Sequence, residues 1–164
     1  MTASPHSKSA GPRASYIVGA WLAAVSGLVA AVPASAGPIG FQGSGGWNSE
    51  NEDFCLGAGA RVGVGPVTLI PNAEWFFVDS GSTYALSLDG TLNVLPLGVA
   101  AGYLGAGTGM FTVKPDGGES NTEAVLNLIA GVGLNAVPLR PFAQIKWIVI
   151  DGDDPFVFSV GARF

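Results

Sequence analysis

Four charged residues stand inside otherwise apolar or glycine-rich stretches of the chain, and they are the residues best suited to do chemistry. They are two cations and two anions: Arg61, Lys146, Glu74 and Asp89. A charge that leaves water is costly unless it is paired and hydrogen-bonded. We therefore predict an ion-pair and hydrogen-bond network of these four with the amide side chains of Asn72, Asn93, Asn127 and Gln144. The alternative is an ion or solute path lined by the same groups.

The chain offers little for hydrolytic catalysis. Its only histidine is His6, whereas most hydrolytic sites need a histidine as base or acid near a serine or aspartate. A mechanism that uses carboxylates alone would have to employ Glu74 and Asp89. We interpret those two residues as partners in charge pairing, and we expect neither an enzyme nor a cofactor.

A weak candidate for a metal site is the run Asp151-Gly152-Asp153-Asp154, because its oxygen ligands suit a hard cation such as calcium. The run is short and lacks an EF-hand frame, so we interpret it as a solvated acidic turn and predict no metal. Cys55 is the only cysteine, which excludes an internal disulfide. We expect its side chain to point inward and to be inert.

Residues 1–36 have the pattern of an export signal. Lys8 and Arg13 precede an uncharged apolar stretch from Tyr16 to Val32, and Ala34-Ser35-Ala36 matches an A-x-A cleavage site. We predict cleavage after Ala36. The alternative is an uncleaved membrane anchor, but the apolar stretch is at the short limit for a span.

The remaining residues, 37–164, have the size of one domain. They hold all 12 acidic residues of the chain and only the basic residues Arg61, Lys114, Arg140, Lys146 and Arg163, so the net charge is about −7. A strongly negative field repels nucleic acid, and we expect no such partner.

Turn residues divide this domain into eight extended segments. We predict strands at residues 38–47, 54–64, 67–78, 83–94, 98–113, 123–135, 139–150 and 155–164. Tight connections at Gly65-Pro66, Leu95-Pro96-Leu97 and Ala136-Val137-Pro138 alternate with longer polar ones. Short turns that alternate with long loops are typical of an antiparallel up-and-down barrel that crosses the bacterial outer membrane.

The side chains alternate along these segments. In 83–94, one face carries Tyr84, Leu86, Leu88, Leu92 and Val94, and the other face is polar. A soluble lipocalin-like barrel would turn the apolar face inward. The polar faces here carry few charges and many glycines, such as Gly131 and Gly133, which would make room for large polar side chains in a narrow lumen. We therefore predict an apolar face toward lipid.

The last segment ends on an aromatic residue with its apolar side chains on one face. Phe156, Phe158, Val160 and Phe164 share this face. We expect Phe164 to close the barrel against the first strand near Ile39 and Phe41. Trp47, Trp75, Phe77, Trp147 and Phe156 fall near the expected outer ends of strands, as in an interfacial aromatic girdle.

The chain resembles the small outer-membrane β-barrel family of OmpA- and OmpX-like proteins. The resemblance rests on Tyr103–Gly109, on Leu139–Ala143 and on Val160–Phe164, together with the export signal. It implies an eight-stranded transmembrane barrel, and it implies that the terminal aromatic pattern is read by the barrel-assembly machinery. In contrast to full-length OmpA, we expect no peptidoglycan-binding domain in this protein and therefore infer no role in tethering the cell wall.

We thus expect a non-enzymatic protein of the outer membrane, surrounded by lipid, with a lumen plugged by side chains and a structural or surface-interaction role. A narrow pore for small solutes is one alternative. A secreted, soluble binding barrel is the other.

Overall fold

The computed structural model describes residues 39–50, 52–135, 138–149 and 155–164. The expected signal peptide with its cleavage residues Ala34 and Ala36, and the acidic run with Asp151, Asp153 and Asp154, lie outside these residues. Within the described residues, no helix is long and apolar enough to cross a bilayer.

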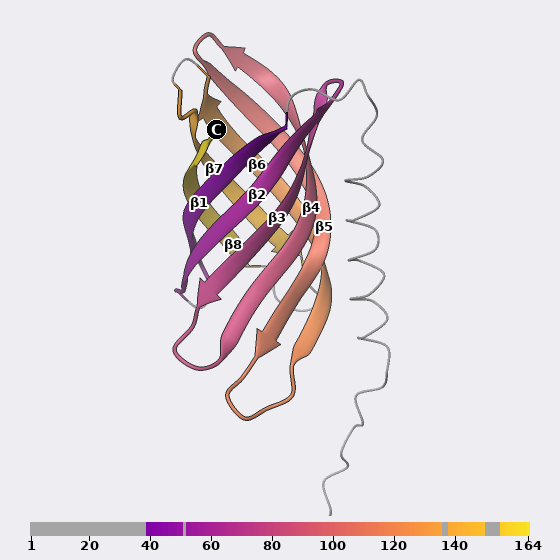
Figure 1. The fold of residues 1–164 in the computed structure, drawn as a ribbon, viewed down its shortest axis with the longest axis vertical. Helices are drawn as coiled ribbons and strands as arrows, with labels where there is room; N and C mark the ends of the chain where they lie inside the picture. The colour runs from indigo at the N-terminus through magenta and orange to yellow at the C-terminus, as the bar shows by residue number, and fades with distance from the viewer. Residues whose placement is uncertain (1–38, 51, 136–137, 150–154) are drawn as a thin grey trace, which may run out of the picture. The chain divides into compact units, whose positions relative to one another are not determined.

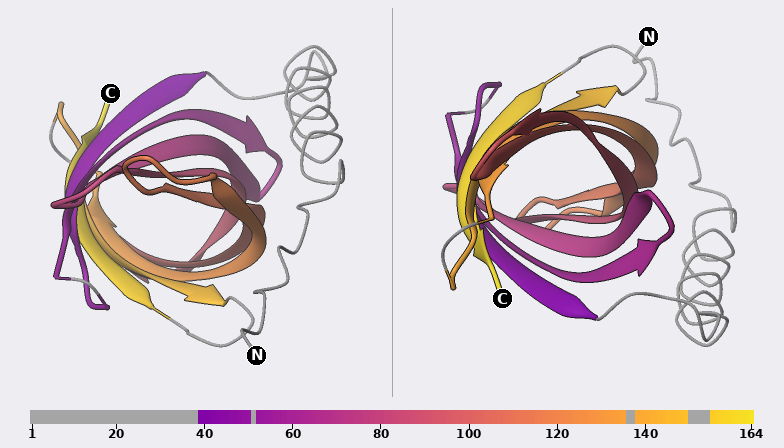
Figure 2. Two further views of the ribbon diagram at one scale, coloured as in Figure 1. Left: turned by 90° about the horizontal axis from the view of Figure 1, so that it is seen from below. Right: turned by 90° about the horizontal axis from the view of Figure 1, so that it is seen from above.

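The described residues form a closed antiparallel barrel of eight strands, each paired with its neighbours in sequence (Figures 1 and 2). The strands are β1 Gly40–Asn48, β2 Phe54–Val64, β3 Val67–Phe77, β4 Ser82–Leu97, β5 Ala100–Lys114, β6 Asn121–Leu134, β7 Pro141–Val149 and β8 Phe156–Arg163. Pairing of β1 with β8 closes the ring. The predicted fold class is therefore confirmed.

The two ends of the barrel differ. At the turn end, β2 and β3 are joined at 65–66, and β4 and β5 at 98–99. At the loop end, longer segments join the strands at 49–53, 78–81 and 115–120. Gly65 and Gly98 have φ values of 60° and 72°, a left-handed conformation that glycine adopts without the steric cost of a side chain.

One predicted turn is wrong. Leu95, Pro96 and Leu97 do not form a bend but continue β4, and the turn follows at Gly98 and Val99. Proline fixes φ at a value that extended backbone accepts, so Pro96 stays in the strand, where it pairs with Ala101 after a register shift between Asn93 and Leu95. The glycine with positive φ, not the proline, sets the turn.

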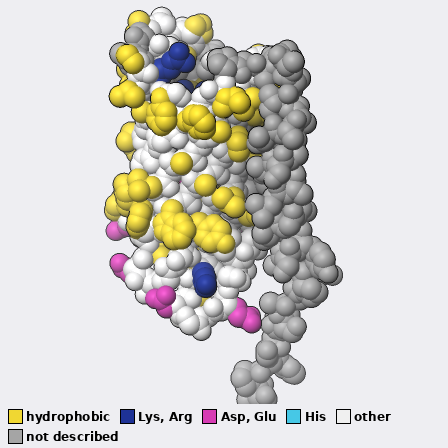
Figure 3. Space-filling view, viewed as in Figure 1, with side chains coloured by type: hydrophobic (Ala, Val, Ile, Leu, Met, Phe, Trp, Pro, Cys, Tyr) yellow, Lys and Arg dark blue, Asp and Glu magenta, His cyan; other side chains and the backbone are white. Residues whose placement is uncertain are grey.

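The outward face of the barrel is apolar. Large side chains on it are about half exposed, for example Trp47 at 50 %, Leu128 at 47 % and Val160 at 52 %. On the face that Figure 3 shows, hydrophobic side chains gather in one band near the loop end and another near the turn end. The loop-end band contains Trp47, Phe54, Trp75, Phe77, Trp147 and Phe156. Phe54 stacks on Phe77, and Trp75 stacks on Tyr84. The polar side chains of the strands mostly point inward, which positions the site.

Candidate functional site in the barrel lumen

The centre of the lumen holds a buried cluster of charges. Lys146 Nζ lies 2.9 Å from Glu74 Oε2 and 3.3 Å from Asp89 Oδ2. These three side chains come from β7, β3 and β4, so the contacts cross the lumen. Lys146 is only 1 % exposed, Glu74 5 % and Asp89 2 %. The structure thus brings together three of the four charged residues that the sequence singled out.

Neutral donors complete the coordination of Asp89. Asn127 Nδ2 donates a hydrogen bond to Asp89 Oδ1 at 2.9 Å, and Ser87 Oγ donates to Asp89 Oδ2 at 3.1 Å. Among the described residues, Lys146 is the one lysine that faces the two carboxylates of Glu74 and Asp89. Buried carboxylates need hydrogen bonds to offset the cost of desolvation, and the Ser87 and Asn127 side chains provide them to Asp89. We call Glu74, Ser87, Asp89, Asn127 and Lys146 the central ion cluster.

Arg61 is not part of the central ion cluster. Arg61 Nη1 donates instead to Gln42 Oε1 at 3.1 Å, nearer the turn end of the barrel. The expected amide members are also divided. Gln144 Oε1 accepts a hydrogen bond from Tyr103 OH at 3.1 Å, Asn93 lines a cavity at the turn end, and Asn72 is buried with no partner for its Oδ1 among the described residues.

Apolar side chains form a cluster at the loop end of the lumen, beside the buried polar side chains of Asn48 and Thr83, where the sequence predicted a polar interior. This apolar cap consists of Cys55, Phe76, Ala85, Val125, Ile148 and Val157, with Val78 and Phe111 packed against it. Phe76 is 1 % exposed and Val157 0 %, and the rings of Phe76 and Phe111 meet edge to face at 5.4 Å between centroids. Cys55 is buried in the cap, as its expected inward position requires.

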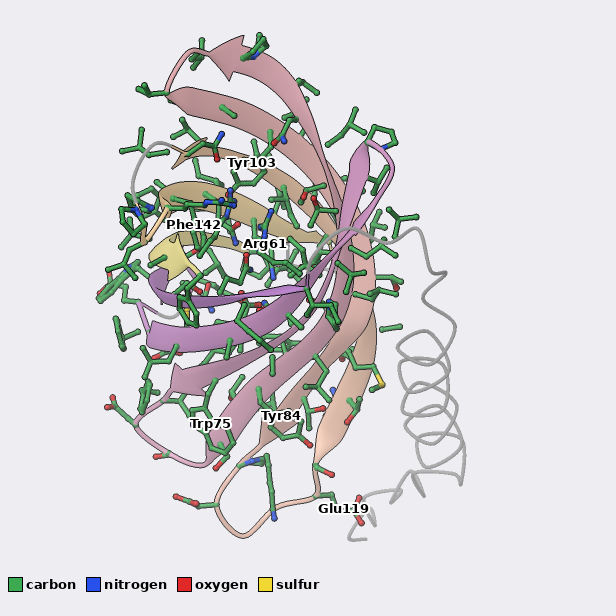
Figure 4. All side chains as sticks on the ribbon, turned by 45° about the horizontal axis from the view of Figure 1, so that its top comes forward. Arg61, Trp75, Tyr84, Tyr103, Glu119 and Phe142 are labelled. Carbon is green, nitrogen blue, oxygen red and sulfur yellow. The ribbon has the colours of Figure 1, made fainter. Side chains whose placement is uncertain are left out.

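Aromatic rings and arginines occupy the turn end of the lumen. The Arg163 guanidinium lies between the rings of Tyr103 and Phe142, 4.6 Å from each centroid. Figure 4 shows Arg61, Tyr103 and Phe142 close together in this part of the barrel, and Trp75 and Tyr84 toward the opposite end. A guanidinium between two ring faces is stabilised by cation–π attraction.

Three inward glycines provide the space for this arrangement. A Cβ on Gly131 would overlap the Tyr103 ring, one on Gly133 would lie 2.7 Å from Arg163 Nη1, and one on Gly161 would lie 2.7 Å from Phe142 Cζ. The sequence predicted that inward glycines such as Gly131 and Gly133 make room for large polar side chains. The structure places Tyr103, Arg163 and Phe142 beside the three glycines, so two of the large side chains are aromatic.

Metal-binding chemistry finds no support in the part of the chain that the structure describes, where no group of three or more His, Cys, Asp or Glu side chains could hold an ion. The central ion cluster can neutralise charge and fill space. Lys146 pairs with the carboxylates of both Glu74 and Asp89.

Comparison of the structure with solved structures finds proteins of the same architecture, whereas comparison of the sequence does not. No protein-family model matches the chain, and no curated protein matches it in sequence. Neisserial surface protein A is similar with a TM-score of 0.65 at 16 % identity, over 79 % of this chain and 97 % of that one. The N-terminal β-barrel domain of Pseudomonas aeruginosa OprF gives 0.63 at 15 %, over 77 % and 96 %.

At such low identity the likeness shows the fold alone. It agrees with the closed antiparallel pairing of the strands described above. The chain therefore has the fold of the small eight-stranded outer-membrane β-barrels, the OmpA- and OmpX-like architecture that its sequence resembles.

Proposed function

We propose that this protein is a non-enzymatic β-barrel of the bacterial outer membrane, that its own side chains plug the lumen, and that it has a structural or surface-interaction role carried by its loops. The observation that carries the proposal is the burial of Lys146, at 1 % exposure, between Glu74 and Asp89 in the middle of the lumen.

The apolar outer face supports a place in lipid. Soluble monomers rarely expose large contiguous apolar patches, yet this barrel exposes tryptophan, phenylalanine and leucine side chains around its wall (Figure 3). A secreted soluble barrel would need the opposite orientation. Lipid is therefore the proposed surrounding, and the barrel-assembly machinery of the outer membrane is the proposed partner during biogenesis.

The plug has two layers. The central ion cluster links β3, β4, β6 and β7 across the lumen, and the apolar cap lies next to it toward the loop end. Eight strands enclose an interior just wide enough for side chains. Water or an ion moving along the axis would have to separate both layers, so we favour a plug over the alternative of a narrow pore.

A role at the surface would fall to the loop end. Its described segments carry Glu50, Glu52, Asp53, Asp79, Asp116 and Glu119 against Lys114, and Figure 3 shows acidic side chains gathered there. Burial and the charge of Asp79 raise the pKa of Asp53. An acidic rim of this kind favours cationic partners or divalent ions.

Three experiments test the proposal. Planar-bilayer recording of the purified, folded protein should give no steady conductance, and a steady, defined conductance would contradict the plug. Cell fractionation should place the protein with the outer membrane. Recovery in the soluble fraction without detergent would contradict the membrane location. A binding and phenotype comparison of strains with and without the 115–120 loop then tests the surface role.

A further inference from the structure

The turn end of the barrel contains a cavity of about 460 Å³ that the proposed function does not use. Three arginines line it, Arg61, Arg140 and Arg163, together with the neutral polar side chains of Thr68, Asn93 and Asn135. We call the three arginines and this cavity the arginine mouth. No aspartate or glutamate is among its described lining residues. Phe164 also lines the cavity, and within the described residues its terminal carboxylate forms no ion pair with any of the three arginines.

Carboxylates elsewhere in the described residues do not neutralise these charges. The ion pairs among those residues are the two that Lys146 makes, and neither involves an arginine. Arg61, Arg140 and Arg163 line the same cavity, so each guanidinium faces the like charges of the other two. Bringing cations together in this way costs free energy unless an anion binds between them.

The guanidiniums of Arg61 and Arg163 are held in place and keep unused donors, whereas the Arg140 side chain is exposed. Arg163 is fixed between Tyr103 and Phe142, and its buried Nε finds no hydrogen-bond partner among the described residues. Arg61 uses Nη1 to bind Gln42, although a guanidinium has five N–H donors. Arg140 is exposed at the rim, and its carbonyl accepts a hydrogen bond from Arg163 N at 3.2 Å, which fixes the two residues relative to each other.

Pre-positioned guanidiniums with free donors suit an oxyanion. Arginine binds phosphate and carboxylate through paired N–H donors. A phosphate monoester carries roughly −1.5 to −2 charge at neutral pH and three acceptor oxygens, so it neutralises several guanidiniums better than a single carboxylate does. A cavity of 460 Å³ is large enough to hold such a group with part of the molecule that bears it.

We propose that the arginine mouth is a binding site for a phosphate monoester group, supplied either by a small soluble molecule or by a lipid headgroup. Arg61 and Arg163 form its inner wall, and Arg140 closes it at the rim. The site lies at the end of the barrel opposite the acidic loops, so it is separate from the surface role proposed above.

Calorimetric titration of the folded protein in neutral detergent micelles tests this site. The probes are glycerol 3-phosphate in solution and phosphatidic acid added to the micelles. We expect saturable binding of at least one probe. Binding of glycerol 3-phosphate indicates that a soluble ester suffices, and binding of phosphatidic acid alone indicates a lipid source. Binding of neither probe overturns the proposal.

Substitutions locate the binding. Arg140→Gln, at the exposed rim, and Arg61→Gln should each weaken binding about tenfold, because each removes charge-assisted hydrogen bonds to the anion. The matched control is Lys114→Gln, which removes one positive charge at the loop end and should leave the affinity unchanged. Heat-modifiable migration on a gel verifies that every variant is folded. Equal affinities in Arg140→Gln, Arg61→Gln and Lys114→Gln would refute the site.

Discussion

Phe41 and Phe164 exchange two backbone hydrogen bonds. Phe41 N donates to Phe164 O at 2.7 Å, and Phe164 N donates to Phe41 O at 2.9 Å. The pair continues the seam between β1 and β8 one residue beyond Arg163, the end of β8. Phe164 therefore contributes main-chain bonds to the closure of the barrel, in addition to an aromatic ring that is 66 % exposed.

Deletion of Phe164 should reduce the amount of assembled barrel while leaving export unchanged. The deletion removes two hydrogen bonds, each of which stabilises a protein by about 1 kcal/mol, from the seam between β1 and β8 that closes the barrel. Phe164→Ala keeps both bonds and removes the ring, so comparing the two variants separates the contributions of the main chain and the side chain. The measurement is the fraction of heat-modifiable protein in membranes. An unchanged fraction after the deletion would contradict this role.

Lys146→Met should destabilise the barrel by roughly 3–5 kcal/mol, because it leaves Glu74 and Asp89 buried without their cation. Adding Glu74→Gln and Asp89→Asn to Lys146→Met should recover most of the loss. Urea unfolding in detergent, followed by tryptophan fluorescence, measures both effects. The control is Lys114→Met at the exposed loop end. Equal stabilities of Lys146→Met and Lys114→Met would show that the central ion cluster contributes little.

Gly131→Ala should destabilise the protein by about 1–3 kcal/mol, because the new methyl group overlaps the Tyr103 ring and must displace it. Gly90→Ala is the matched control, since a Cβ there would lie 3.6 Å from its nearest neighbour, the carbonyl oxygen of Ala106. The same urea titration compares the two. If both substitutions have the same effect, the glycines do not act by making room in the lumen.

Brominated lipids should quench the tryptophan fluorescence of the barrel. Trp47, Trp75 and Trp147 are exposed by 50 %, 50 % and 51 % on the outer wall near the loop end. Bromine close to the headgroups should therefore quench more strongly than bromine at the bilayer centre. Trp75→Phe should reduce the amount of tryptophan fluorescence that the brominated lipids quench. Equal emission in brominated and ordinary lipid would contradict a lipid-facing wall.

Much of the fold could be predicted from the sequence because strand side chains alternate strictly between faces. Alternation placed Glu74, Asp89 and Lys146 on one face and Trp75 and Trp147 on the other, as in the structure. The alternation of short and long connections predicted eight strands, which is the number in the barrel. The turn at Gly98 was not predicted, because the sequence suggested a bend at Pro96. In the structure Pro96 lies within β4, and the positive φ of Gly98 makes the turn.

The depth of each residue along the barrel was not predictable in the same way. Alternation predicts whether a side chain points outward or into the lumen. The stagger between neighbouring strands determines its depth along the barrel, and therefore which side chains it contacts across the lumen. Arg61 was therefore grouped with Lys146, although it lies with Gln42. The apolar cap was missed for a related reason, since Phe76 and Ile148 occupy inward positions beside polar residues of the same strands.

The apolar cap gives the protein a built-in reporter. Cys55 is the only cysteine of the chain and is 3 % exposed within the cap. A thiol reagent in water can reach its sulfur only when the loop end of the lumen separates. The rate of labelling therefore measures how often the barrel interior opens at its loop end, without any engineered probe.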